Sequence, residues 1–382
     1  MTDAYIVSAV RTPVGRRRGG LSAVHPADLS GSIMRAAVER AGVTPDAVDD
    51  VLWGCVDQIG AQSTNLARTG WLAGGLPESV PGTTIDRQCG SSQQAVHFAA
   101  QAVMSGAQDV VVAGGVEVMS LVPISSPALI GPEHGYGVPY DGEGWNARYG
   151  AVEVSQFHGA ELIAQRWGIT RTAMEEYALR SHQRAIAAQQ AGAFDDEIVP
   201  VGEVRVDEGP RPDTSLEKMA ALDPLRDGGR ITAAVASQIS DGAAAVVVAS
   251  EQAVRQHGLT PLARVRAMAV VGADPIEMLS APIPATAAVL KRAGLALSDI
   301  DHVEINEAFA PVVLAWLADT GADPARTNPL GGAIALGHPL GATGARLMTS
   351  LVHALRRDGG PFGLQTMCEG GGMANATVLE TL

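Results

Sequence analysis

Two parts of the chain repeat each other at a constant spacing, and this repeat constrains the fold more than any other feature. Residues 290–294 match residues 38–42, and residues 300–303 match residues 48–51, with one offset in both pairs (293 − 41 = 252 and 303 − 51 = 252). A constant offset across a helix, a strand and the loop between them indicates two homologous halves. Because related halves usually meet face to face, we expect equivalent loops of the two halves to converge at one edge.

The first half alternates helical and strand-like segments. Helices are predicted at residues 28–40 and directly after the loop that holds Cys89, where Gly106 is placed to end the second one. Strands are predicted at residues 49–56 and 109–113, the latter closed by Gly114-Gly115. This alternation predicts a layered α/β fold with a mainly parallel sheet.

The second helix of this half carries an apolar pattern. Its spacing of three and four residues predicts one buried face made of Ala95, Phe98, Ala99, Ala102 and Val103. The helix would therefore pack one side against the sheet.

Cys89 stands where a polar loop enters this helix. Free backbone N–H groups and the positive end of a helix dipole favour a thiolate at such a position, and Gly90 leaves room for a second molecule to approach. The residues alone leave two interpretations open, a nucleophile or a small buried apolar side chain, which is what most free cysteines are. Cys55 lies inside an apolar run and is predicted to be core.

The repeat brings two further reactive side chains toward Cys89. The residue equivalent to Cys89 in the second half is Gly341, which lies in the same loop as His338. The residues equivalent to Gly114-Gly115 lie next to Cys368. Histidine can serve as the base for a cysteine nucleophile near neutral pH, and a second cysteine can move a proton. Backbone N–H groups of the glycines that begin at Gly370 could donate to an oxyanion, and Asn306 offers an amide to hold a water. Each residue also has an ordinary structural interpretation as a loop histidine, a turn or a cap.

The chain between the repeats has a different composition. Residues 121–230 hold Pro-rich turns and a polar helix at about 171–190, and they are predicted to form an inserted loop domain over the sheet edge. We expect an N-terminal half at 1–120, completed by a returning strand within 231–250, and a C-terminal half at 251–382.

Composition excludes several classes of protein. The net charge of −14 argues against a nucleic-acid binder. Three cysteines are too few for a disulfide framework, so a reducing cytoplasm is the expected location. The sequence shows no signal peptide and no apolar run long enough to cross a membrane, and its cysteines and histidines lack metal-ligand spacing, so no metal is expected.

The assembled motifs resemble those of thiolases from end to end. The matching stretches, in chain order, are 7–13, 89–92, 114–120, 240–244, 306–310, 337–341 and 368–372. The resemblance implies a five-layered α-β-α-β-α fold, built from two duplicated halves plus a loop domain, that assembles as a homodimer or homotetramer.

The resemblance also implies catalytic roles. Cys89 would carry the acyl group as a thioester, and His338 would activate it and form one oxyanion hole with a water held by Asn306. Cys368 would move the second proton, and the N–H groups of Cys89 and Gly370 would form the second hole.

Binding residues follow from the same resemblance. Coenzyme A would be the co-substrate, with no permanently bound cofactor, and Ser237 and Arg211 match the family's CoA contacts. The substrate-binding residues would further include Phe309, Met278 and Phe157.

Two stretches depart from thiolases that handle acetoacetyl groups. Gln156-Phe157-His158 stands where those enzymes carry His-Met, and residues 233–237 replace an Ala-Gly-Asn-Ala-Ser stretch. The Gln-Phe pattern is similar to that of actinobacterial thiolases associated with bulky lipid- or steroid-derived chains.

These features predict a degradative 3-ketoacyl-CoA thiolase, an acyltransferase that releases acetyl-CoA in fatty acid β-oxidation. Its partners would be acyl-CoA and CoA, without nucleic acid or membrane insertion. The alternatives are a biosynthetic acetoacetyl-CoA thiolase, a ketosynthase of the same fold and a non-catalytic lipid carrier. A ketosynthase would pair its cysteine with two His, or with His and Asn, rather than with Cys368.

Overall fold

Two copies of one strand and helix arrangement account for most of the protein. The computed structural model describes residues 3–382. The first copy consists of β1 (Ala4–Arg11), β2 (Gly15–Arg16), α1 (Pro26–Ala41), β3 (Asp50–Gly54), α2 (Leu66–Ala73), β4 (Gly82–Ile85), α3 (Ser91–Ser105), β5 (Val110–Val118) and β6 (Ser240–Ser250). The second consists of β7 (Ala263–Gly272), α10 (Pro282–Ala293), β8 (His302–Ile305), α11 (Ala310–Thr320), α12 (Ala333–Leu336), α13 (Leu340–Asp358), β9 (Phe362–Glu369) and β10 (Met373–Thr381).

The structure keeps the offset found in the sequence. Strands β3 and β8 begin at Asp50 and His302 (302 − 50 = 252), and strands β5 and β9 begin at Val110 and Phe362 (362 − 110 = 252). Helices α1 and α10 end at left-handed caps, Gly42 and Gly294, which are also 252 residues apart (294 − 42). Equivalent positions of the two copies can therefore be compared directly.

The strands run in the order β4-β3-β5-β6-β1 in the first copy and β7-β10-β9-β8 in the second. Within residues 3–382, the two sets join where Tyr5 and Ile6 of β1 pair with Arg264 and Ala263 of β7. Parallel pairing occurs at β3–β4, β3–β5 and β8–β9, while β5–β6, β1–β6, β7–β10 and β9–β10 are antiparallel. The expectation of a mainly parallel sheet is wrong, because β6 returns after the insertion and β10 after a tight turn.

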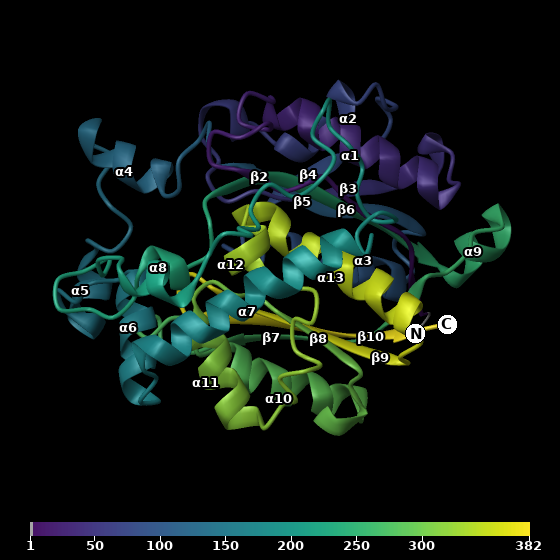
Figure 1. The fold of residues 1–382 in the computed structure, drawn as a ribbon. Coiled ribbons are helices and arrows are strands. Elements are labelled where there is room, and N and C mark those ends of the chain that lie inside the picture. Colours follow the sequence, from purple (N-terminus) through teal and green to yellow (C-terminus); the bar gives the residue numbers. More distant parts are fainter. Residues whose placement is uncertain (1–2) are drawn as a thin grey trace.

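Five layers result, as Figure 1 shows: α1 and α2 outside, one set of strands, the helices α3 and α13, the second set of strands, and α10 and α11. This arrangement confirms the predicted five-layered fold. Helix α3 is buried on most of its sides because it lies in the middle layer. The predicted single buried face is therefore wrong in detail: Phe98 is 40% exposed, whereas polar Gln93, Gln94 and His97 are buried.

Strand β5 continues through Gly114-Gly115 to Val118, rather than ending at these glycines as predicted. The glycines serve a close approach instead of a turn. A Cβ atom on Gly115 would lie 2.1 Å from the carbonyl oxygen of Gly341, and one on Gly341 would lie 2.6 Å from that of Val116. The start of α13 therefore rests directly on the backbone of the other half.

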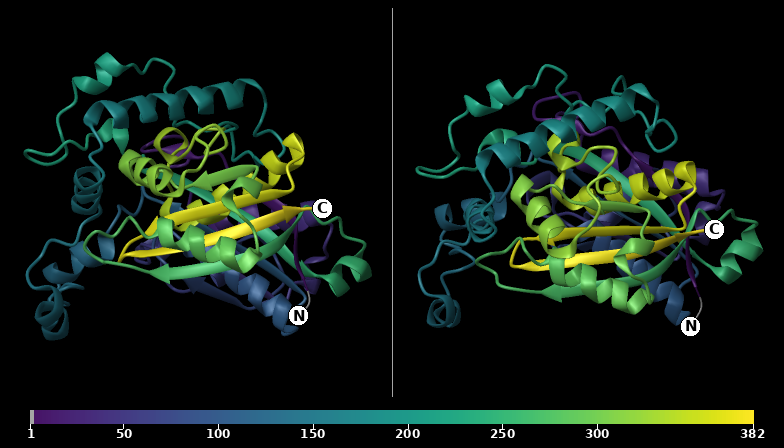
Figure 2. Two further views of the ribbon diagram at one scale, coloured as in Figure 1. Left: turned by 90° about the horizontal axis from the view of Figure 1, so that it is seen from below. Right: turned by 60° about the horizontal axis from the view of Figure 1, so that its bottom comes forward.

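The insertion carries α4 (Ser126–Glu133), α5 (Glu143–Tyr149), α6 (Gln156–Arg166), α7 (Arg171–Gln190) and α8 (Leu216–Ala220). Figures 1 and 2 show α4, α5 and α6 at one end of the sheets and both termini at the other end. Helix α7 has the bounds predicted for the polar helix. A short helix, α9 (Glu251–His257), leads from β6 into the second half.

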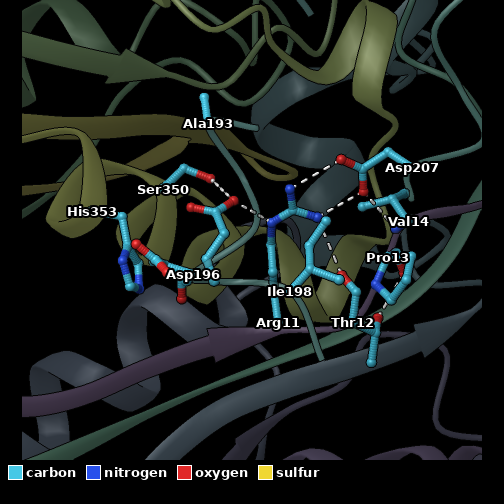
Figure 3. Close-up of polar contacts among 12 residues, drawn as sticks. Arg11, Thr12, Pro13, Val14, Ala193, Asp196, Ile198, Asp207, Ser350 and His353 are labelled. Carbon is cyan, nitrogen blue, oxygen red and sulfur yellow. Dashed lines mark hydrogen bonds and ion pairs between the residues drawn. The ribbon is translucent and has the colours of Figure 1, made fainter. Parts of the chain in front are cut away.

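A buried ion network fixes the insertion to the first half. Arg11, at the end of β1, donates from Nη1 to Asp207 at 2.6 Å, and its Nε pairs with Glu197. Glu197 also accepts from Ser350 of α13 at 2.9 Å (Figure 3). One guanidinium thus connects the first strand, the insertion and the second half, and removing it would leave two buried carboxylates without the direct ion pairs that it makes.

Gly115→Ala tests the close approach between the halves. The added methyl group has no free space, so we expect the free energy of unfolding to fall by about 3 kcal/mol or more. Chemical denaturation followed by circular dichroism, at a fixed protein concentration, measures the change. The control is Gly144→Ala on α5, where a Cβ meets nothing within 4 Å and stability should stay equal or rise slightly. Equal stability of the two variants would contradict the packing described here.

Candidate active site

Cys89 lies on the turn that leads into α3, with Gly90 at the cap position. Its side chain keeps partial access to solvent. Burial and the charge of Glu369 raise the pKa of Cys89 to about 12, while the backbone N–H groups of Cys89 and Gly370 oppose this shift. The resting side chain is therefore a thiol, and a base is needed to make it a nucleophile.

His338 lies just before α13 and is held by contacts at both ring nitrogens. Its Nδ1 lies 2.6 Å from the hydroxyl of Thr343, and its Nε2 lies 3.4 Å from Nδ2 of Asn306. The Thr343 hydroxyl donates to the carbonyl of Pro339 at 2.8 Å, so it accepts from Nδ1–H of the histidine. This pattern assigns the free lone pair to Nε2, on the side of Asn306.

The electrostatics keep this imidazole neutral. Burial, together with the nearby Arg346 guanidinium, lowers the pKa of His338 to about 3. Asn306 is fully buried, and its Oδ1 has no hydrogen-bond partner within residues 3–382. A neutral histidine beside an amide with unused capacity can accept a proton and orient a water.

Cys368 lies near the end of β9 and is fully buried. Burial raises its pKa, and negative charge on Cys89 and on Glu369 raises it further. The effect of Cys89 on Cys368 indicates that the two side chains lie near each other, although they are 279 residues apart in the chain (368 − 89). The turn of Gly370, Gly371 and Gly372 follows directly and connects β9 to β10.

A cavity of about 770 Å³ opens at Cys89. Of the predicted residues, Gly370, Phe157 and Met278 line it with Cys89, and so does Leu340, two residues after His338. The insertion supplies much of the remaining lining, including Ile124, Ala128, Val138 and Tyr140. Phe309 is buried behind this wall, where its ring contacts that of Phe157 edge-on with centroids 5.6 Å apart. Such a lining suits an apolar acyl chain.

The two residues predicted to contact CoA lie beside this cavity rather than in its wall. The backbone N–H of Ser237 donates to the carbonyl of Ala308, which does line the cavity. Arg211 is exposed, and its Nη2 lies 3.4 Å from Oε1 of Gln238. The backbone carbonyl of Gln238 in turn accepts from the N–H of His338. A cation at the outer side of the site suits a polyanionic ligand.

Sequence reasoning missed three polar residues of the site, namely Thr343, Glu117 and Glu369. Thr343 has no signal in the sequence, because its role depends on a helix turn that brings it back to His338. The two glutamates are separated by the repeat offset (369 − 117 = 252), so the duplication could have shown that they are equivalent.

Two structural findings concern metals and membranes. In the described part of the chain, no group of three or more His, Cys, Asp and Glu side chains could hold a metal ion. No helix within residues 3–382 has the length and apolar character needed to span a bilayer.

Comparisons with known proteins agree with this geometry. The thiolase N-terminal domain family matches residues 4–252, and the thiolase C-terminal domain family matches residues 259–381. The steroid 3-ketoacyl-CoA thiolase FadA6 of Mycobacterium tuberculosis is 58% identical, and the match covers 100% of this chain and 95% of that protein. The 3-ketoacyl-CoA thiolase of an Enterobacter species is 43% identical, with 100% of both chains covered.

Solved structures show the same architecture. Human mitochondrial 3-ketoacyl-CoA thiolase superposes with a TM-score of 0.90 at 38% identity, covering 100% of this chain and 99% of that one. The same human enzyme in complex with CoA gives a TM-score of 0.88 at 39% identity, covering 100% and 98%. The Bacillus anthracis acetyl-CoA acetyltransferase gives 0.89 at 37% identity, covering 100% and 99%. Sequence, fold and matched domains agree over the whole length, and this chain belongs to the thiolase family of acyltransferases.

Proposed function

We propose that this thiolase is a degradative 3-ketoacyl-CoA thiolase that acts on bulky lipid- or steroid-derived acyl chains. The observation that carries the proposal is the cavity of about 770 Å³ that opens at Cys89 with a largely apolar wall from the insertion. An acetoacetyl group would leave most of this space empty. The relatives include a steroid 3-ketoacyl-CoA thiolase and another 3-ketoacyl-CoA thiolase, which supports both the degradative reaction and the bulky substrate.

The first half-reaction uses Cys89 and His338. His338 Nε2 takes the thiol proton, and the sulfur attacks the 3-keto carbon of the substrate. The resulting alkoxide is stabilised by donors fixed in the fold before the substrate arrives. The bond between C2 and C3 then breaks, the acyl group remains on Cys89, and the acetyl-CoA enolate takes a proton from Cys368.

The second half-reaction restores both sulfurs. The thiol of an incoming CoA gives its proton to the Cys368 thiolate, and the CoA sulfur attacks the acyl-Cys89 thioester. The tetrahedral intermediate collapses to the shortened acyl-CoA, and Cys89 regains its proton from His338. In this scheme Arg211 and Ser237 bind CoA from the outer side of the site.

Both half-reactions can run in reverse, so the residues themselves also permit acetoacetyl-CoA synthesis. The similarity to the Bacillus anthracis acetyl-CoA acetyltransferase is compatible with that activity. The cavity size favours the degradative assignment, because a condensing enzyme for two acetyl units has no use for an extended apolar wall.

Replacing the nucleophile tests the central step. Cys89→Ala should lower the thiolysis rate by about 1,000-fold or more, because it removes the atom that carries the acyl group. Absorbance of the 3-ketoacyl thioester measures turnover, and wild-type enzyme without CoA should carry an acyl mass adduct on the peptide containing Cys89. The control is Cys55→Ala, since Cys55 is buried outside the cavity wall. Near-normal turnover of Cys89→Ala would refute the assignment.

Thr343→Val tests the orientation of His338. The change removes the acceptor for Nδ1–H, so we expect kcat to fall by about 10- to 100-fold while KM changes little. Thr349→Val is the matched control, because the hydroxyl of Thr349 donates to the carbonyl of Ala345 in the same buried helix and has no other hydrogen bond within residues 3–382. Equal kinetics of the two variants would show that Thr343 does not orient the base.

Narrowing the cavity tests the substrate class. Ala128→Phe on α4 should lower kcat/KM for ring-bearing 3-ketoacyl-CoA by about tenfold or more and leave acetoacetyl-CoA almost unaffected. Leu129→Phe is the control, because the neighbouring Leu129 is 67% exposed and does not line the cavity. Equal losses on small and large substrates would argue against a bulky acyl chain.

A further inference from the structure

Each half of the molecule sends one glutamate to the helix start of the other half. Glu117 at the end of β5 accepts from the N–H of Gly341 at the start of α13, at 2.9 Å. Its repeat-mate Glu369 at the end of β9 lies against Gly90 at the start of α3. A Cβ atom on Gly90 would meet Oε1 of Glu369 at 1.9 Å, which places the carboxyl group directly on that backbone.

The two equivalent carboxylates differ in how they are satisfied. Glu117 also accepts from the N–H groups of Val56 and Asp57 and from the side chain of Gln62. Glu369 is fully buried, and neither of its oxygens has a hydrogen-bond partner in the described chain. Burying a carboxylate without hydrogen-bond donors costs free energy. Four N–H donors offset this cost at Glu117, and none within residues 3–382 does so at Glu369.

The surroundings of Glu369 contain few groups that favour its charge. Arg87, in the loop before α3, attracts it, and the backbone N–H of Asn375 on β10 favours the ionised form without forming a hydrogen bond of normal geometry. Cys89 interacts with it from the turn before α3, and Cys368 adjoins it on β9. Asp86 adds negative charge near Cys89 from the exposed loop.

We propose that Glu369 controls the ionisation of Cys89. The space at the start of α3 holds one negative charge, either on the Glu369 carboxylate or on the Cys89 thiolate. This inference rests on the proposed function and adds a control over when the nucleophile is formed. Burial raises the pKa of Glu369 to about 8, so near neutral pH the carboxyl group is largely protonated. Above that pH it ionises first and opposes the loss of the Cys89 proton.

The competition gives the two groups a coupled titration. Below about pH 8, the thiolate fraction of Cys89 rises tenfold per pH unit, as for an isolated thiol. Above that pH, the ionised Glu369 takes the one available charge, and the thiolate fraction levels off until the second proton leaves. A residue that only supported the fold would not produce this break.

Alkylation of Cys89 by iodoacetamide, located by peptide mass spectrometry, measures the thiolate fraction directly. In the wild-type enzyme the rate should rise to about pH 8 and then level off. In Glu369→Gln it should continue to rise, so that the variant reacts about tenfold faster than wild type at pH 9 and about equally at pH 6.5. Glu369→Asp, which keeps a carboxyl group, should keep the break.

The matched control is Asp86→Asn. Asp86 also raises the pKa of Cys89, but it is exposed and accepts from Gln88, so its removal should leave the break near pH 8 in place. A wild-type profile that rises through pH 9 without a break, or a break that persists in Glu369→Gln, would overturn the proposal. If Glu369→Gln does not fold, the wild-type profile still decides. Alkylation requires no turnover, so this result is independent of whether the thiolysis experiments succeed.

Discussion

The contact between the start of α13 and the strands of the first half is the constraint on which the rest of the structure depends. Gly54, Gly115 and Gly341 lie so close that a side chain on any of them would overlap backbone atoms. Glu117 supports this contact by accepting from backbone N–H groups on both sides of it, those of Val56, Asp57 and Gly341. Because the contact fixes α13, it also fixes His338 two residues before the helix.

The same contact explains why the reactive groups lie in a buried environment. Helices α3 and α13 form the middle layer, so the residues that directly precede them lie between the two sets of strands, with Cys89 half-buried and His338 buried. Burial raises the pKa values of Cys89, Cys368 and Glu369 and lowers that of His338. All four groups are thereby held in their neutral forms near pH 7. These four groups therefore form no ion pair with one another in the resting enzyme. A thiolate and an imidazolium form when a substrate carbonyl group is in place to react.

The insertion contributes the shape of the cavity rather than its reactive groups. Its helix α4 supplies part of the wall, while Arg11 binds the later part of the insertion through Glu197 and Asp207. The division resembles that of many enzymes, in which loops determine the substrate and a rigid scaffold holds the chemistry. A change of substrate would therefore require substitutions in the insertion, whereas a change of reaction would require substitutions in the two halves.

The repeat, most helices and strands and the family could be predicted from the sequence. The offset of 252 residues identified the repeat. Periodicity and glycine placement identified most helices and strands, because these signals depend on neighbouring residues. The motifs around Cys89, His338 and Cys368 indicated the family. Only the tertiary structure decided the mixed strand directions, the exposure of Phe98, the continuation of β5 through its glycines and the part played by Thr343. It also decided that Glu117 is fully hydrogen-bonded while its equivalent Glu369 is not. These properties depend on which parts of the folded chain come into contact with a residue. The pattern of neighbouring residues in the sequence does not contain that information.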